Sequence, residues 1–179
     1  MTDEIARTTP GSTRTGRADD GALWKRIASA AVLIPLTLGA LHVGGAVFSA
    51  LVAFLGVLMA FEWTRMIEKR DFSQAFLALA LGGAAAFAAA GAGNYAAAYG
   101  LCAISAVAAA ERSLHGARRP LWTGFGAFYI LAPSIALIWL RNETERGAAL
   151  VFMLYLIVWA ADTGGYVAGR LVGGPKMSP

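Results

Sequence analysis

The sequence has few of the residues with which enzymes usually build covalent or thiol-metal chemistry. It contains 1 cysteine and 2 histidines in 179 residues. A single cysteine, Cys102, excludes an internal disulfide and a metal cluster made of cysteines, and its position in an apolar run favours a packing role. The two histidines, His42 and His115, leave no Ser-His-Asp or Cys-His arrangement. We expect neither of them to be a ligand.

Charge is also scarce. Only 15% of the residues are charged and 58% are hydrophobic, whereas about a quarter of a soluble domain is charged. The mean hydropathy of +0.58 therefore predicts a membrane protein. A net charge of +4 would suggest a nucleic-acid partner in a soluble protein. Here the basic residues lie between apolar runs without an aromatic-basic platform, so no nucleic-acid partner is expected.

Long apolar runs dominate what is present. Six of them can be read, over Ile27–Val43, Ala46–Phe61, Phe72–Ala90, Tyr95–Ala110, Leu121–Leu140 and Gly147–Val167. None alternates with the period of a barrel strand, so only helices can span the membrane. The predicted fold class is therefore all-α, a polytopic transmembrane bundle of about six helices over residues 23–179. The second and fourth runs are short for a span, so five spans or a re-entrant segment remain alternatives. Residues 1–22 are polar and aperiodic, which predicts a disordered cytoplasmic tail.

The basic residues orient this bundle. Of the 15 Lys and Arg residues, only Arg141 and Arg146 fall in the loops on one side of the predicted bundle. The positive-inside rule makes the other side cytoplasmic. Both termini are then predicted to face the cytoplasm, and an even number of spans agrees with this.

Asp162 is the ionisable residue that interrupts the sixth run. At the helical rise per residue it lies about 22 Å along a hydrocarbon core about 30 Å thick, in its cytoplasmic third. A charge at such a depth usually marks a functional site. The alternative is a structural role, in which Asp162 caps a helix break or pairs with Arg170.

Glycines follow Asp162 at regular intervals. In a continuous helix Asp162, Tyr166, Gly169 and Gly173 share one face, and the glycines permit close approach of a helix or a ligand. Alternatively, Gly164 and its neighbouring glycine break the helix and expose backbone N–H groups to an anion. Glycines that serve helix packing alone are the third interpretation.

A carboxylate beside glycines and cations at the cytoplasmic side suits phosphoryl or nucleotidyl transfer. Carboxylates hold Mg²⁺, and cationic side chains neutralise phosphate oxygens. The residues that carry this pattern are "WAADTGGYVAGRLVGGPKMSP" at the C-terminal end. This stretch resembles the phosphatidate cytidylyltransferase family. The segment "LWKRIASAAVLIPLTLGALHVGGAVFSALVAFLGVLMAFEWTRM" is similar to that family's N-terminal region. Together the resemblance covers about Leu23 to Pro179.

The resemblance implies an enzyme of phospholipid biosynthesis that converts CTP and phosphatidate to CDP-diacylglycerol and pyrophosphate. It implies a multi-pass protein of the bacterial inner membrane, with the lipid bilayer and its two substrates as partners and a homodimer as an expected assembly. Asp162 matches the motif's aspartate and would be the catalytic, metal-binding residue for Mg²⁺ or another divalent cation. Arg170 and Lys176 match basic positions for substrate phosphates. Thr163, Gly164 and Tyr166 would shape the substrate pocket.

The family pattern continues beyond the motifs present here. Its Ser-Pro-x-Lys-Thr stretch and terminal signature rich in Lys and Asp are not matched before Pro179, although Ser178 precedes that proline. We therefore expect a chain truncated at the C-terminus and inactive alone. Three other classes remain open: a small multi-pass transporter, a CDP-alcohol phosphotransferase-like enzyme and a non-catalytic scaffold. The transporter predicts an internal repeat that is not visible. The phosphotransferase motif differs by Thr163 and by the separation of Ala168 from Arg170.

Overall fold

The computed structural model describes residues 16–114 and 120–172, and in these two ranges every regular element is an α-helix. The fold class predicted from the sequence is confirmed. The six helices are α1 (Gly16–Val43), α2 (Gly45–Glu68), α3 (Gln74–Gly91), α4 (Tyr95–Ser113), α5 (Pro120–Glu143) and α6 (Gly147–Val172).

The helices coincide closely with the six apolar runs, and α4 and α6 begin at the predicted residues Tyr95 and Gly147. The main difference is at the N-terminus. Helix α1 begins at Gly16, inside the segment 1–22 for which polar composition predicted no regular structure. A helix that starts in an apolar segment can extend into polar residues, because each further residue adds a backbone hydrogen bond. Residues 1–15 lie outside the described residues.

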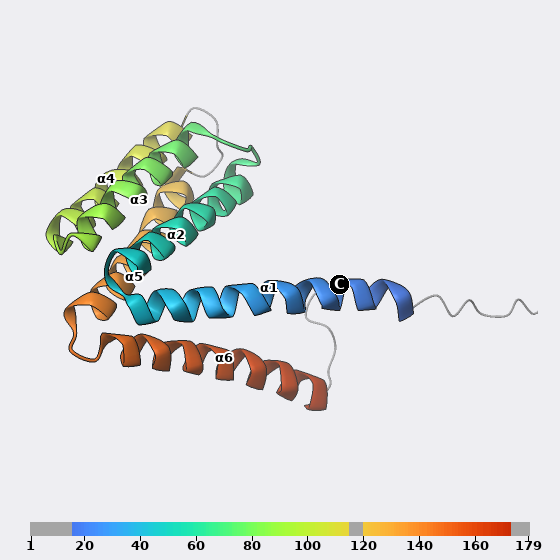
Figure 1. Ribbon diagram of the computed structural model, residues 1–179. Coiled ribbons are helices and arrows are strands. Elements are labelled where there is room, and N and C mark those ends of the chain that lie inside the picture. The colour runs from blue at the N-terminus through green and yellow to red at the C-terminus, as the bar shows by residue number, and fades with distance from the viewer. Residues whose placement is uncertain (1–15, 115–119, 173–179) are drawn as a thin grey trace, which may run out of the picture. The chain divides into compact units, whose positions relative to one another are not determined.

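The chain divides into two units, Met1–Leu38 and Gly39–Pro179. This division falls within α1, after the boundary at residue 22 that composition suggested. In the second unit α2, α3, α4 and α5 lie side by side (Figure 1) and form a four-helix bundle in which α3 contacts all three other helices.

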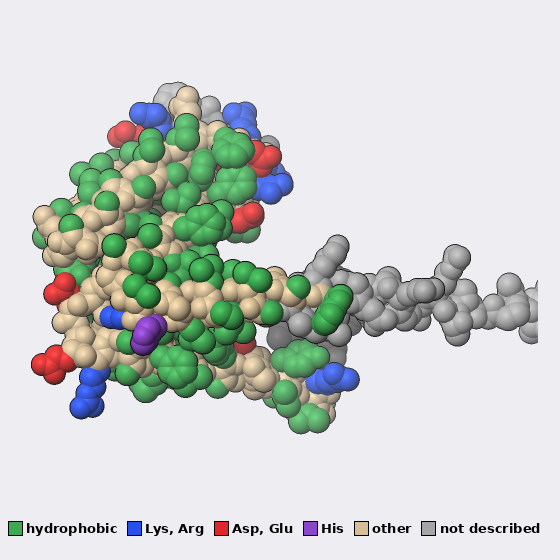
Figure 2. All heavy atoms as spheres, in the orientation of Figure 1, with side chains coloured by type: hydrophobic (Ala, Val, Ile, Leu, Met, Phe, Trp, Pro, Cys, Tyr) green, Lys and Arg blue, Asp and Glu red, His purple; other side chains and the backbone are tan. Residues whose placement is uncertain are grey.

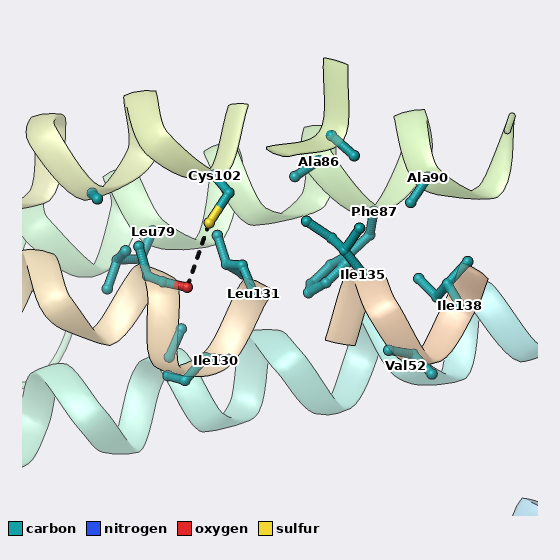
Figure 3. Packing of buried hydrophobic residues seen from close by; sticks show 14 of the residues in the cluster. Val52, Leu79, Ala86, Phe87, Ala90, Cys102, Ile130, Leu131, Ile135 and Ile138 are labelled. Carbon is teal, nitrogen blue, oxygen red and sulfur yellow. Dashed lines mark hydrogen bonds between the residues drawn. The ribbon is translucent and has the colours of Figure 1, made fainter. Parts of the chain in front are cut away.

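The core of the bundle is apolar and closely packed. Phe87 of α3 and Ile135 of α5 are almost completely buried and meet between the helices in Figure 3. Cys102 of α4 is also buried, and its thiol donates to the carbonyl oxygen of Ala127 at 3.7 Å. The packing role predicted for this cysteine is confirmed.

Glycines allow the helices of the bundle to approach one another. A Cβ at Gly56 of α2 would lie 2.7 Å from the Phe87 ring, and one at Gly83 of α3 would lie 2.9 Å from Leu131. Both positions require hydrogen in place of a side chain. Association through small residues is typical of helices in membranes.

Four helices in the described part of the chain are long and apolar enough to cross a membrane: α2, α3, α5 and α6. The apolar part of α1, Ala28–Val43, is shorter. Hydrophobic side chains cover much of the bundle surface seen in Figure 2, and charged ones gather near its ends. This distribution is that of a membrane protein. The number of six spans stays a prediction.

A polar clamp joins the end of α1 to α5 within the second unit. Arg141 donates from Nε to the carbonyl oxygen of Leu41 at 2.7 Å and from Nη2 to that of His42 at 3.1 Å. Asn142 accepts from the backbone N–H of Gly45 at 3.1 Å. The last carbonyls of a helix lack partners inside it, so Arg141 satisfies two of them.

Candidate functional site

The site predicted around Asp162 lies on α6, which begins immediately after a tight turn from α5. The backbone N–H of Gly147 donates to the carbonyl oxygen of Thr144 at 3.0 Å. A Cβ at Gly147 would collide with the carbonyl oxygens of Leu140 and Arg141. Glycine is therefore required where α6 starts, and this contact fixes the first residue of the helix.

Helix α6 continues without interruption through Gly164 and Gly165 to Val172. The alternative of a break at these glycines is therefore wrong, and the alternative of a continuous helix is confirmed. Each glycine costs a helix about 1 kcal/mol relative to alanine, but the long apolar run before them and the absence of proline from α6 maintain the helix. Asp162, Tyr166 and Gly169 consequently share one face, and Gly173 lies outside the described residues.

Most of α6 is uncovered in the second unit. Val151 is completely buried, whereas every residue from Phe152 to Leu171 except the partly buried Tyr155 is exposed. The five described candidate residues all belong to this exposed stretch: Asp162, Thr163, Gly164, Tyr166 and Arg170. Lys176, the sixth, lies outside the described residues.

The carboxylate of Asp162 makes no ion pair or hydrogen bond with another described residue. Arg170 instead donates from Nη1 to the hydroxyl of Tyr166 at 3.4 Å, one helical turn before it. The alternative in which Asp162 pairs with Arg170 is therefore wrong. Asp162 and Arg170 both stay available to a ligand.

The glycines of α6 also have open space above them. A Cβ at Gly164, Gly165 or Gly169 would meet no atom within 4 Å. Among the described residues these glycines therefore do not pack against another helix, unlike Gly56 and Gly83 in the bundle. At these glycines the backbone of α6 is exposed beside the carboxylate of Asp162 and the guanidinium of Arg170. Another helix or an anionic ligand could approach this backbone closely.

Two aromatic residues that sequence reasoning did not select continue the Asp162 face towards the start of α6. The rings of Tyr155 and Trp159 are stacked with centroids 6.1 Å apart. Their positions, seven and three residues before Asp162, follow the helical spacing of neighbours on one face. That spacing is the signal that could have identified them from the sequence.

The described side chains do not by themselves complete a metal site. Within residues 16–114 and 120–172, no three His, Cys, Asp or Glu side chains are grouped closely enough to hold an ion. Asp162 belongs to no such group among the described residues, so an ion at this position needs further oxygen ligands. Phosphate groups of a substrate are one source of such ligands.

A sequence model described as "Cytidylyltransferase family" matches residues 24–179. The chain is 31% identical over 172 residues to proteins named phosphatidate cytidylyltransferase from Brucella suis and Brucella melitensis. These alignments cover 88% of the chain and 58% of each relative, so the chain spans less than two thirds of the length of these relatives. No solved structure matches the chain.

Proposed function

The chain belongs to the cytidylyltransferase family, and from this premise we propose that it serves the transfer of a cytidylyl group from CTP to phosphatidate. The products would be CDP-diacylglycerol and pyrophosphate. The curated relatives carry the name of this activity. The observation that carries the proposal is the exposed carboxylate of Asp162 on an apolar helix, without an ion-pair partner in the described part of the chain. The family match favours this function over a transporter or a CDP-alcohol phosphotransferase.

The proposed reaction is an in-line substitution at phosphorus. A phosphate oxygen of phosphatidate attacks the α-phosphorus of CTP and forms a new P–O bond. The bond from the α-phosphorus to the bridging oxygen of the β-phosphate breaks, and pyrophosphate leaves with that electron pair. No covalent intermediate with the protein is needed, so the side chains act by positioning the substrates and neutralising charge.

Asp162 is the residue we propose as a ligand of Mg²⁺ or another divalent cation. The carboxylate oxygens of Asp162 are ligands that suit a hard cation. Mg²⁺ is usually held by one or two carboxylates together with phosphates and water. The free state of the Asp162 carboxylate fits this requirement. When bound, such an ion would neutralise phosphate oxygens of the substrates.

Cationic side chains would hold the phosphates. Arg170 lies two helical turns after Asp162 and is exposed, and its fork of donors suits phosphate oxygens. Lys176 is proposed to act on the same groups as a point charge. Thr163, Gly164 and Tyr166 would border the substrate, with Gly164 allowing it to approach the backbone of α6.

The proposed setting is the inner membrane of a bacterium, with both termini in the cytoplasm and the bilayer as a partner. This orientation places Asp162 near the side from which CTP arrives. A homodimer is the assembly we propose, and the open space over Gly165 and Gly169 would permit another helix to approach α6.

The test is Asp162→Asn in the natural protein, reconstituted with phosphatidate, Mg²⁺ and labelled CTP. This change keeps the size of the side chain and removes its charge. We expect formation of CDP-diacylglycerol to fall by about 10²–10³-fold, as for a lost electrostatic contact to the transition state. Because Asp162 has no partner among the described residues, the unfolding temperature should stay the same.

The matched control is Glu145→Gln. Glu145 is an exposed carboxylate in the turn between α5 and α6, and its neutralisation should leave turnover unchanged. Near-normal turnover of the Asp162→Asn protein would remove Asp162 from the proposed site.

A further inference from the structure

A second polar site lies away from α6, at the turn between α2 and α3. The turn borders a cavity of about 340 Å³, a size within the usual range of small-ligand pockets. Figure 2 shows acidic and basic side chains around this end of the bundle. The lining residues are Glu68, Arg70, Asp71, Phe72, Ser73 and Gln74 from the turn and Arg112 from the last turn of α4.

Most charges of this cavity are not paired inside the described structure. Asp71 is bound by Arg65, with Nε 3.0 Å from the carboxylate. Arg70 and Arg112 are exposed and form no ion pair with a described residue. With Asp71 neutralised by Arg65, two guanidinium groups and one carboxylate, that of Glu68, remain at the cavity. This balance favours an anion.

Glu68 adds a second requirement. Its Oε1 atom is buried and has no hydrogen-bond partner among the residues that the structure describes. Buried polar atoms in proteins are almost always hydrogen-bonded, and an exception calls for a specific explanation. Because Glu68 also lines the cavity, a donor on a bound ligand could satisfy this carboxylate.

The turn that forms the cavity has an unusual backbone. Lys69 and Phe72 both have φ of 53°, in the left-handed region that non-glycine residues rarely adopt. The ring of Phe72 packs against those of Phe61 and Phe76, with centroids 5.2 and 5.8 Å away. These contacts hold Phe72 in its conformation, and non-glycine residues with strained backbone are concentrated at functional sites. Lys69 instead has the left-handed conformation of a helix C-cap, and its backbone N–H donates to the carbonyl oxygen of Arg65.

The position of the turn indicates where a ligand would come from. Helix α2 ends at Glu68 and α3 begins at Gln74, and both are long and apolar enough to cross a membrane. The short connection between them must therefore lie at the membrane surface, at the level of lipid headgroups. Most of the basic residues lie on this side of the predicted bundle, so the positive-inside rule predicts that this is the cytoplasmic surface.

We propose that this cavity binds a phosphate ester that carries a hydrogen-bond donor close to its phosphate, with an aminophospholipid headgroup as its source. Arg70 and Arg112 bind the phosphate oxygens, and the carboxylate of Glu68 accepts from the amine. The arrangement suits phosphoethanolamine, which presents both groups. It does not depend on the activity proposed for α6.

The experiment uses native mass spectrometry of the natural protein in detergent, titrated with phosphatidylethanolamine or phosphatidylcholine. The first lipid has an amine that can donate, and the second does not. We expect tighter binding of phosphatidylethanolamine, and a loss of about tenfold in its affinity on Arg112→Gln, as for one charge-assisted hydrogen bond. Arg70→Gln should act similarly, and Arg112→Lys should retain most of the binding.

The matched control is Arg146→Gln, an equivalent change at an exposed arginine of the α5–α6 turn, which should leave lipid binding unchanged. Glu68→Gln should reduce the preference for phosphatidylethanolamine over phosphatidylcholine. The thermal unfolding temperature of each variant shows that it is folded. Unchanged phosphatidylethanolamine affinity in both Arg70→Gln and Arg112→Gln would overturn the proposal.

A further arm distinguishes the two sources of the ligand. Soluble O-phosphoethanolamine should displace the lipid only at a large molar excess, because it lacks the chains that hold a lipid at the membrane surface. Displacement at equal concentrations would overturn the assignment to a lipid headgroup and assign the cavity to soluble phosphate esters.

Discussion

Gly126 of α5 is the position at which one added methyl group should be most informative about the bundle. A Cβ at Gly126 would collide with Nε1 and Cδ1 of the Trp63 indole on α2. The same indole donates from Nε1 to the carbonyl oxygen of Trp122 at 3.0 Å. Its ring centroid lies 5.3 Å from that of Tyr129. Gly126→Ala must therefore move the indole or separate α2 from α5.

The size of the effect follows from the contacts that change. Overpacking costs about 1–3 kcal/mol, and loss of the Trp63 hydrogen bond and of its contact with Tyr129 costs about 1 kcal/mol each. Alanine favours the helix over glycine by about 1 kcal/mol. We expect Gly126→Ala to lower the free energy of unfolding by about 2–4 kcal/mol.

The measurement is equilibrium unfolding of the purified protein in mixed detergent micelles. Gly100→Ala is the matched control, because Gly100 also lies within a helix and a Cβ there would meet no atom within 4 Å. It should be neutral or raise stability by up to about 1 kcal/mol through helix propensity. A Gly126→Ala protein as stable as the Gly100→Ala protein would refute the reasoning.

Two further predictions concern the α5–α6 end of the bundle. Replacing Arg141 with Met removes two hydrogen bonds to the end of α1 and should lower the unfolding free energy by about 2 kcal/mol; the exposed Arg146→Met is its control, and equal stabilities would contradict the role of the clamp. Thr144→Cys in a protein without Cys102 should react with an impermeant thiol reagent added outside the cell, and reaction only from the cytoplasmic side would reverse the predicted topology.

The helices themselves were largely predictable from the sequence. Hydrophobic runs are local features of a sequence and can be read without the structure. Helix α4 begins at Tyr95, directly after the N-cap Asn94, and α6 begins at Gly147, directly after a charged turn. Asn94 indeed accepts from the backbone N–H of Ala97 at 3.1 Å. The start of α1 was not predictable in the same way, because its first residues are polar and aperiodic.

The candidate site was predictable in its residues more than in its surroundings. Asp162 and Tyr166 could be placed on one face by spacing alone, but two adjacent glycines left the continuity of α6 open. The cavity at the α2–α3 turn was not predicted at all. Its left-handed residues are Lys69 and Phe72, and neither is a residue type that signals such a turn. Phe72 is stabilised by ring contacts with Phe61 and Phe76, which the residue type at position 72 does not predict.

The tight turn at Gly147 determines more than the direction of the chain. Helix α6 has a fixed first residue and no interruption. The number of residues from Gly147 to Asp162 therefore determines how deep Asp162 lies in the membrane and in which direction around the helix axis its side chain points. One residue inserted between them would rotate the carboxylate by about 100° around the helix axis and shift it by about 1.5 Å. Four inserted residues would nearly restore its facing but move it by about 6 Å along the membrane normal. The number of residues between Gly147 and Asp162 should therefore tolerate change far less than their identities do.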